Sequence, residues 1–293
     1  MADKLMLTGA SGQLGLAIGQ RLLATGQTNL VFGSRTPEKL VGRLGSQDRI
    51  RHIDFDLEES LQHGLHDVGT LFIISTDALA HPGQRIAQHR NALEAARRAG
   101  VQRVLYTSMP NPAHSVEIPF ALDHAEMEAD LAASELKYTI LRNSWYQENL
   151  LAYLPAIARS GVWYTSAGQG RIAYAAREDI AHASAALAVR AHDVSGVFEL
   201  AGPEALTQEE IAQAVQQATG KPLRVEHVSS QRVSEELGRL GLDPHVIALV
   251  LMTEANQRAG LFEVGEGSLP HYLDHAPTYL ADFLHRHAAV FAA

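Results

Sequence analysis

The chain has no cysteine among its 293 residues. This absence excludes disulfides, catalysis by a thiolate, and zinc or iron–sulfur sites built on cysteine. Positive charge is also scarce: 24 Lys and Arg stand against 33 Asp and Glu, without a basic run, so no nucleic-acid partner is expected. No apolar run reaches the roughly 18 residues of a membrane span, and a strand expected at the very start leaves no room for a signal peptide. We therefore expect a cytoplasmic protein without a membrane partner.

A glycine-rich turn stands near the start, between an expected strand (residues 5–7) and an expected helix. The turn has the sequence TGASGQLG over residues 8–15. Gly9 would let the strand turn sharply, Gly12 would leave room for a pyrophosphate, and Gly15 would let helix and strand pack closely. Free N–H groups at the start of the helix would receive the phosphates. The motif therefore predicts dinucleotide binding, with a tight turn alone as the alternative.

The second expected strand, residues 29–33, leads to Arg35, about 20 residues beyond Gly15. An NAD-specific fold has an acid here, which binds the ribose 2′-hydroxyl. A carboxylate would repel the 2′-phosphate of NADP, whereas a guanidinium can bind it through two hydrogen bonds. We therefore expect NADP(H) as the cofactor, with a solvated surface Arg35 as the alternative.

Thr36 as N-cap and Pro37 at the first helical position predict another helix.

Three further strands and one helix continue the alternation, at residues 51–55, 70–75 and 101–107 and at residues 84–99. Asp54 and Phe55 would lie beside the adenine, one as acceptor and one as apolar wall. Ser75, Thr76 and Asp77 follow a nearly wholly apolar strand, at the carboxyl end where ligands bind in parallel sheets. His89 lies on the apolar face of the helix, where we expect a hydrogen-bonded, half-buried residue. A contact with the cofactor is the alternative.

This alternation predicts an α/β fold, with a Rossmann-type doubly wound parallel sheet over residues 1–150. From about residue 150 helices mix with short strands, which predicts a smaller α/β lobe over residues 151–293, suited to binding substrate. Residues 197–200 are typical of a strand that returns to the main sheet. The two lobes are therefore expected to be interleaved.

The Tyr–Lys pair of short-chain dehydrogenases has no counterpart in this chain. That pair is spaced four residues apart, and a Glu follows four residues after the Lys. If Glu128 fixes the register, Phe120 stands in place of the Tyr and His124 in place of the Lys. A phenyl ring has no proton to donate, so carbonyl reduction with Tyr as the acid is not expected. His124 would titrate near neutrality and could protonate a product oxygen; a helix-surface residue without a role is the alternative.

A sixth strand, residues 137–141, ends in a polar and aromatic stretch, RNSWYQEN over residues 142–149. An amide and a ring at the end of a strand suit contact with a nicotinamide. Asn143 would position the nicotinamide amide or the substrate oxygen. Trp145 and Tyr146 would supply a ring-binding surface, together with Phe120 and Tyr153. A loop whose aromatic residues only cap the core is the alternative.

Three stretches together resemble the NmrA-like branch of atypical short-chain dehydrogenases: TGASGQLG, GQRIAQHRNALEAARRAGVQRVLYTS and YTILRNSWYQENL. The patterns GQRxxQHRN and LRNxWYxEN are more specific to the NAD(P)H:quinone oxidoreductase group. That group also lacks the Tyr–Lys pair and has His at the position of His124. The resemblance implies flavin-free hydride transfer from NADPH to a quinone-like small molecule. The branch also contains proteins that sense NADP(H) without catalysis and reductases of triarylmethane dyes, and these are the alternatives.

The resemblance also implies which residues contact the cofactor. The phosphate loop would be formed by Gly9, Ala10, Ser11, Gly12, Gln13 and Leu14, and the 2′-phosphate contact by Arg35. The end of the fourth strand would contribute Ser75, Thr76 and Asp77. The loop and turn near the nicotinamide would contribute Leu141, Arg142, Asn143, Ser144, Trp145, Tyr146 and Ile172. Ser144 stands where the family pattern has Gly, and Asp77 lies in a stretch expected to be rich in serine. Both departures bear on the shape of the cofactor site.

The C-terminal part shows two helix starts and scattered histidines. Thr207 and Glu210 form a capping box for a helix that ends at Gly220. The apolar helix from Asp243 to Gly260 fits the core or a subunit interface, as in a homodimer, better than a ligand wall. His271, His275, His285 and His287 have no matching carboxylate spacing, so we interpret them as surface residues and expect no metal site.

Overall fold

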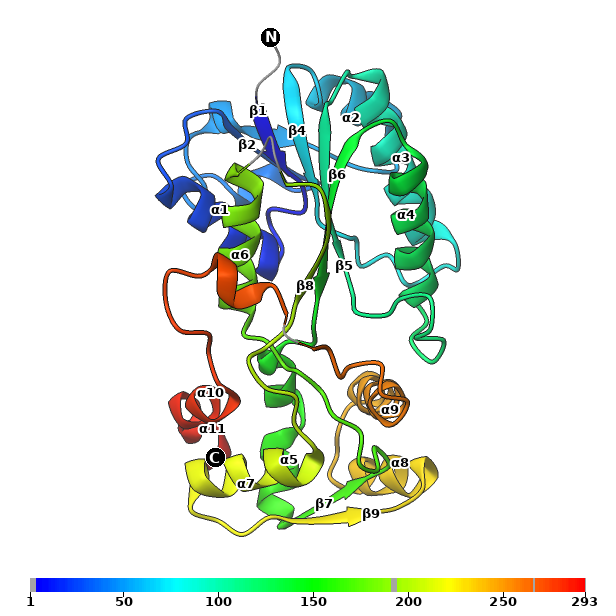
Figure 1. The fold of residues 1–293 in the computed structure, drawn as a ribbon, viewed down its shortest axis with the longest axis vertical. Coiled ribbons are helices and arrows are strands. Elements are labelled where there is room, and N and C mark those ends of the chain that lie inside the picture. The colour runs from blue at the N-terminus through cyan, green and yellow to red at the C-terminus, as the bar shows by residue number, and fades with distance from the viewer. Residues whose placement is uncertain (1–3, 191–193, 266, 293) are drawn as a thin grey trace.

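The computed structural model describes residues 4–190, 194–265 and 267–292. A parallel sheet with helices on both faces forms the upper part of Figure 1, and a smaller, mostly helical lobe lies below it. The strands of the main sheet are β1 (Lys4–Leu7), β2 (Leu30–Ser34), β3 (Ile50–His52), β4 (Val68–Ile73), β5 (Arg103–Ser108), β6 (Lys137–Asn143) and β8 (Gly196–Leu200). They lie in the order β3-β2-β1-β4-β5-β6-β8, and every neighbouring pair is parallel.

Both faces of this sheet are buried, as the apolar strands predict. Successive residues of a strand point to opposite faces. Leu5 and Leu7 therefore pack in the core beneath α1 (Gln13–Ala24) and α6 (Arg177–Val189). Met6 packs on the other side, with α2 (Glu58–Gly64), α3 (Gln84–Arg98) and α4 (Ala121–Ala133). The two groups of helices flank the sheet in Figure 1. The predicted Rossmann-type fold is confirmed.

The smaller lobe has its own core around Trp163 and Phe262, both of which are fully buried. Its elements are α5 (Leu154–Ser160), β7 (Val162–Thr165), α7 (Gln208–Thr219), β9 (Arg224–His227), α8 (Ser230–Arg239), α9 (Pro244–Arg258), α10 (Leu280–Arg286) and α11 (Ala288–Ala292). The strands β7 and β9 pair in parallel. Both hydrogen bonds of the capping box that Thr207 and Glu210 predict are present at the start of α7.

The two lobes are interleaved in sequence. After α5 and β7, the chain returns to add α6 and β8 to the main layer, where β8 pairs with β6. This confirms the expectation for residues 197–200. Four short 3₁₀ turns complete the described elements: η1 (Pro37–Lys39), η2 (Gln47–Arg49), η3 (Gln147–Ala152) and η4 (Leu269–Tyr272).

Two local predictions are wrong. Thr36 and Pro37 begin only the short turn η1, and Thr36 makes no side-chain cap. The chain leaves helical geometry soon afterwards, because Gly42 and Gly45 have positive φ angles of 76° and 107°. The third strand ends at His52 rather than at Phe55, since the N–H of Asp54 donates to the Ser60 hydroxyl instead of a neighbouring strand.

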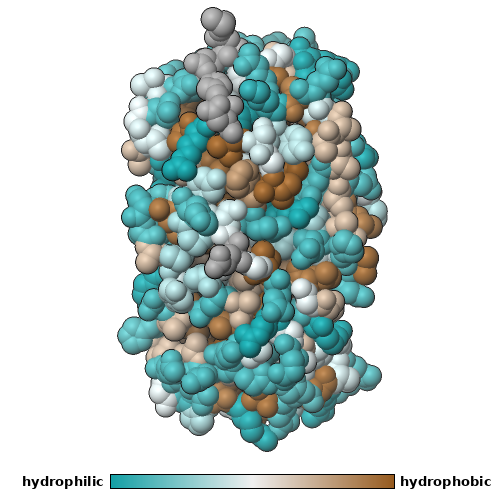
Figure 2. Space-filling model, viewed as in Figure 1, coloured by the Kyte–Doolittle hydropathy of each residue, from teal (hydrophilic) through white to brown (hydrophobic). Residues whose placement is uncertain are grey.

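One face of the molecule is shown in space-filling form in Figure 2. On the face shown in Figure 2, hydrophilic side chains dominate and the hydrophobic patches between them are small. Across residues 4–190, 194–265 and 267–292, no helix is long and apolar enough to cross a membrane.

Candidate functional site

A cavity of about 630 Å³ lies at the carboxyl ends of the parallel strands, where ligands bind in such sheets. The turn after β1 and the ends of β2, β4, β5 and β6 form most of its wall. The structure brings most of the predicted site residues together there: Gly9, Ser11, Gly12, Gln13, Leu14, Arg35, Asp54, Phe55, Ser75, Thr76, Asp77, His124, Asn143, Ser144, Trp145 and Tyr146.

Four predicted residues lie outside the cavity wall. Ala10 and Leu141 are fully buried in the core beneath α1 and α6. Ile172 is fully buried and forms a β-bridge with Leu206. Arg142 points away and forms ion pairs with Glu128 at 2.6 Å and Glu199 at 3.0 Å. The side chains of these four residues therefore do not reach the expected cofactor site.

The glycines of the first turn have different roles. Gly9 has a φ of 61°, and a Cβ on Gly15 would lie 2.2 Å from the Gly9 carbonyl oxygen, so the chain itself requires both. A Cβ on Gly12 would meet only that oxygen, at 3.4 Å, so the protein leaves space beside Gly12 in the cavity wall. No side chain caps the start of α1. Its first N–H groups are therefore left for a ligand, which suits a pyrophosphate.

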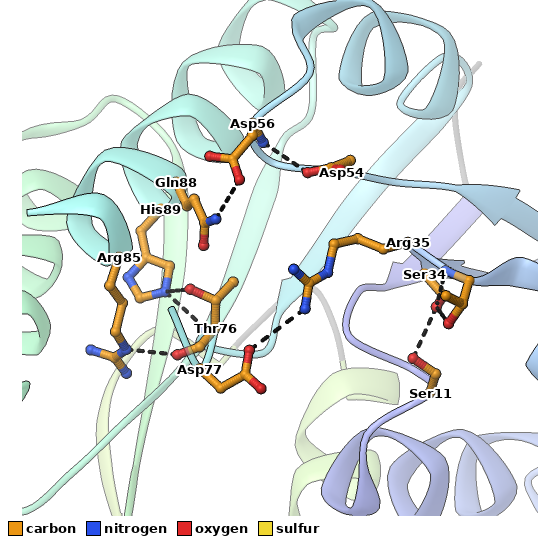
Figure 3. A network of polar contacts seen from close by, with 11 residues as sticks. Ser11, Ser34, Arg35, Asp54, Asp56, Thr76, Asp77, Arg85, Gln88 and His89 are labelled. Atoms are coloured by element: carbon orange, nitrogen blue, oxygen red, sulfur yellow. Dashed lines mark hydrogen bonds and ion pairs between the residues drawn. The ribbon is translucent and has the colours of Figure 1, made fainter. Parts of the chain in front are cut away.

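At one end of the cavity, Arg35 extends from the end of β2 toward the loop after β4 (Figure 3). Its guanidinium lies 3.6 Å from a carboxylate oxygen of Asp77, and both side chains are well exposed. Beside it, the Ser34 hydroxyl donates to the Ser11 hydroxyl at 2.9 Å and accepts from the N–H of Thr36 at 3.0 Å. An exposed guanidinium with serine hydroxyl groups beside it suits a phosphate group.

Arg85, in the first turn of α3, places a buried cation in the cavity wall. It is 4% exposed. Its guanidinium donates to the carbonyl oxygens of Thr76 at 2.7 Å and Phe120 at 3.2 Å, and to Nε2 of His124 at 2.8 Å. A carboxylate oxygen of Asp123 lies 3.6 Å away. The acceptors around it fix the orientation of this charge.

The donors around His89 and His124 determine their tautomers. Arg85 can only donate, so Nε2 of His124 must accept and Nδ1 carries the hydrogen. The N–H of Thr76 likewise donates to Nε2 of His89 at 3.0 Å, drawn in Figure 3, so Nδ1 of His89 also carries the hydrogen. Both Nδ1 atoms face the hydroxyl of the buried Tyr106, at 3.3 Å for His89 and 2.9 Å for His124. His89 is thus hydrogen-bonded as expected, although it is fully buried.

None of these three groups is an acid at neutral pH. Burial, reinforced by the charge of Arg85, lowers the pKa of His89 to about 3 and that of His124 well below its usual value. Burial raises the pKa of Tyr106. The expectation that His124 titrates near neutrality is therefore wrong, and so is the alternative of a helix-surface residue, since His124 is 4% exposed. His124 instead positions Arg85.

The opposite end of the cavity combines unpaired polar atoms with aromatic rings. Among the described residues, Oδ1 of Asn143 and Oγ of Ser144 are buried without a hydrogen-bond partner. The rings of Phe120 and Trp145 are nearly parallel, at 8°, with centroids 6.4 Å apart. Burial raises the pKa of Tyr146, and a hydrogen bond from Asn143 partly opposes this shift. The unpaired oxygens suit a carboxamide, and the rings suit a flat molecule.

Tyr153 does not join this surface. It is buried in the core of the smaller lobe, with its hydroxyl 3.4 Å from that of Tyr174. The expectation that it holds a flat ring is therefore wrong.

The cavity wall also contains residues that sequence reasoning missed: Thr8, Ser34, Ile53, Ile74, Arg85, Gln88, Thr107, Ser108, Met109, Asn149 and Leu249. For Arg85 a signal existed, because it precedes His89 by one helical turn and shares its face. Leu249 corrects the interpretation of α9, since this helix contributes to the cavity wall as well as to the core.

Comparisons with known proteins agree with this geometry. Residues 9–191 match a family model described as NAD(P)H-binding. Quinone oxidoreductase 2 of Escherichia coli K12 is 34% identical over 278 residues, which cover 94% of this chain and 96% of that protein. The crystal structure of an NADPH-dependent quinone oxidoreductase from E. coli, complexed with NADPH, superposes with a TM-score of 0.86 at 32% identity, covering 96% of this chain and 99% of the other. A triphenylmethane reductase from Citrobacter sp. gives a TM-score of 0.86 at 27% identity, covering 97% and 99%.

Proposed function

The chain belongs to the NmrA-like family of NAD(P)H-binding proteins, and on that basis we propose that it is an NADPH-dependent reductase of quinone-like small molecules that needs no flavin. The observation that carries the choice of substrate is the aromatic end of the cavity, where Phe120 lies beside the buried cation of Arg85 and nearly parallel to Trp145. Neither His124, which is hydrogen-bonded to that cation, nor Tyr106, which is hydrogen-bonded to His124, is an acid at neutral pH. Such a site suits an acceptor whose reduced form is an anion that a positive charge stabilises, and that does not need a proton during hydride transfer.

The described residues fit NADPH. Gly12 and the uncapped start of α1 would hold the pyrophosphate, and Arg35 would bind the 2′-phosphate. Asn143 and Ser144, whose buried oxygens lack partners, would bind the carboxamide of the nicotinamide. When bound, the cofactor supplies a hydride.

A quinone suits the remaining chemistry. Addition of a hydride to a quinone gives a hydroquinone anion, whose conjugate acid resembles a phenol with a pKa of about 10. An alkoxide formed from a ketone is far more basic and needs a proton donor at once. The absence of a Tyr at position 120 therefore matches a quinone. The hydride supplies the first hydrogen, and the one proton that completes the hydroquinone can come from water after the anion has formed.

Arg85 would stabilise this anion. Its guanidinium remains charged at any physiological pH, and a buried cation acts more strongly than one in water. Its contacts with Thr76, Phe120 and His124 fix it before substrate arrives, so little reorganisation is needed. The flat faces of Phe120 and Trp145 would hold the ring of the acceptor nearby, which brings the two reactants together.

Steady-state oxidation of NADPH with a panel of benzoquinones and naphthoquinones tests the proposal. We expect quinone-dependent turnover, faster with NADPH than with NADH. Asn143→Ala should lower turnover more than NADPH affinity if its amide acts on the reacting ring. A cationic triarylmethane dye serves as the comparison substrate, and Arg85 should disfavour it. If no quinone accelerates oxidation while NADPH changes the association of the protein with a partner, the proposal fails in favour of a sensor.

Two further proposals concern assembly and location. We propose a homodimer and a cytoplasmic location. Light scattering coupled to size-exclusion chromatography tests the first, and fractionation of cells tests the second. A monomer at micromolar concentration would contradict the dimer.

A further inference from the structure

A second group of chemically active side chains lies on α6 and on the segment between η4 and α10. It comprises Asp179 and His182 of α6 and Asp274 and His275 of that segment. Nε2 of His182 lies 3.5 Å from Oδ1 of Asp274, and Nε2 of His275 lies 3.9 Å from Oδ1 of Asp179. One ligand atom from each of His182, Asp274 and His275 lies within 4.8 Å of the others. None of the four lines the cavity described above.

We propose that these residues bind a divalent transition metal ion, for which zinc is the best match. Zinc takes imidazole nitrogens and carboxylate oxygens at about 2.0–2.2 Å in a tetrahedral site. Ligand atoms in such a site are roughly 3.3–3.6 Å apart. The separation of His182 and Asp274 already meets this spacing, and the side chain of His275, 40% exposed, has room to complete it.

The hydrogen bonds around the histidines leave nitrogen lone pairs available. Nδ1 of His275 lies 2.8 Å from the carbonyl oxygen of Ala276, which can only accept, so Nδ1 carries the hydrogen and Nε2 has the free lone pair. A backbone carbonyl on the second nitrogen is one of the common outer contacts of a metal-bound histidine. Nδ1 of His182 is buried without a hydrogen-bond partner in the part of the chain that the structure describes. No hydrogen bond to Nδ1 therefore fixes the tautomer of that ring.

The carboxylates supply the charge that a dication requires. Asp179 is 3% exposed, and its Oδ2 accepts from the N–H of Thr278 at 2.7 Å, which leaves Oδ1 facing His275. Asp274 is exposed and free to move toward an ion. Two carboxylates and two neutral imidazoles carry a charge of −2, which balances one divalent cation. Asp179 therefore completes the site as the fourth ligand, because its Oδ1 faces the Nε2 atom of His275 that would bind the ion.

An ion here would tie the C-terminal segment to the main layer. The helix α6 packs against α1 beside the sheet, whereas α10 packs against α7 in the smaller lobe. The connecting segment is already bound at Thr278, whose carbonyl accepts from Gln147 at 2.9 Å. It runs from the region of α6 down to α10 in Figure 1. The metal would add a second fixed point, so we expect it to stabilise the fold rather than take part in catalysis.

The sequence alone gave no sign of this site. The spacing of Asp179 and His182 places them on one face of a helix, but Asp274 and His275 are far away along the chain. The interpretation of His275 as a surface residue outside any metal site is therefore replaced by this proposal.

Titration of chelator-treated, full-length protein with Zn²⁺ by calorimetry, and with Co²⁺ by visible absorption, tests the site. We expect one ion per chain, a tetrahedral Co²⁺ spectrum, and a rise of several degrees in Tm with Zn²⁺. His182→Ala and Asp274→Asn should each weaken Zn²⁺ binding at least tenfold and abolish the rise in Tm. His285→Ala, which removes an exposed histidine of α10, is the matched control and should change neither.

Metal-free Asp274→Asn should keep the unfolding temperature and NADPH affinity of the unmodified protein, because Asp274 is 78% exposed. It therefore decides the question even if His182→Ala fails to fold. The proposal is overturned if the unmodified protein does not bind Zn²⁺ below millimolar concentration. It is equally overturned if Asp274→Asn binds Zn²⁺ as tightly as the unmodified protein does. Neither result affects quinone reduction, which is measured separately.

Discussion

The guanidinium of Arg35 lies 3.6 Å from the carboxylate of Asp77, and the two side chains are 62% and 91% exposed. Arg35 comes from the end of β2 and Asp77 from the loop after β4, so the pair spans one end of the cavity (Figure 3). A pair this exposed is worth about 0–1 kcal/mol. A 2′-phosphate can therefore replace Asp77 as the partner of Arg35, at little energetic cost.

This exchange predicts opposite effects for the two residues. Arg35→Ala should weaken NADPH binding by about 10- to 100-fold, since a charge-assisted hydrogen bond contributes about 1.5–3 kcal/mol. NADH affinity should change little. Asp77→Asn should strengthen NADPH binding a few-fold, because it removes the competing carboxylate. Fluorescence titration measures both, and equal affinities of the unmodified protein for NADH and NADPH would contradict the assignment.

Substitution of Gly12 separates cofactor binding from folding. Gly12→Val should abolish dinucleotide binding while the unfolding temperature stays nearly unchanged, because its side chain would fill the space for the pyrophosphate. Gly15→Ala is the informative control. Its Cβ would lie 2.2 Å from a backbone oxygen, so it should destabilise the fold by at least about 1–3 kcal/mol. A folded Gly12→Val protein that binds NADPH normally would show that this glycine serves the turn alone.

Arg85 should affect turnover more than binding. Arg85→Gln should lower kcat with a benzoquinone about 100-fold, the usual loss when one preorganised electrostatic donor is removed. NADPH affinity should be preserved. His124→Ala should cause a smaller loss, because it removes one of the acceptors that hold Arg85. Transient kinetics with deuterated NADPH isolates the hydride step. An Arg85→Gln enzyme with full activity would refute the role of this cation.

The two buried histidines predict a loss of stability in acid. Both imidazoles are neutral in the folded protein, and the pKa of His89 is lowered to about 3. In the unfolded chain both titrate near pH 6.5, so below that pH the unfolded state binds more protons. The free energy of unfolding should then fall by about 1.4 kcal/mol per pH unit for each group, down to about pH 3 for His89. Above pH 7 these groups should contribute no pH dependence.

Urea unfolding at pH 7, 6 and 5 measures this slope. His89→Gln is the comparison, because an amide can still accept from Thr76 and donate to Tyr106 but does not titrate. The free energy of unfolding of the variant should depend less steeply on pH, by the equivalent of about one fewer proton taken up on unfolding. Identical slopes in the two proteins would show that His89 is protonated in the folded state.

The sequence predicted the features that depend on local pattern. The glycine turn, the apolar strands and the capping box at Thr207 follow from backbone geometry and hydrophobic period, and the structure has them in place. The Arg85, His124 and Tyr106 network was not predicted, because it joins α3, α4 and β5 through side chains only. The same limit applies to Leu249, which reaches the cavity from α9, and to Arg142, which turns away to Glu128. Such contacts depend on how elements pack.

The return of β8 to the edge of the sheet has a consequence for biosynthesis. Until about residue 200 has left the ribosome, β6 has no partner on one side and α1 lacks the cover of α6. An unpaired edge strand invites pairing with other chains. The nascent protein must therefore keep this edge protected while α5, β7 and α6 are being made. A nucleotide-binding half released by a single cut at residue 150 would keep that open edge permanently, so the main sheet is complete only in a chain that reaches about residue 200.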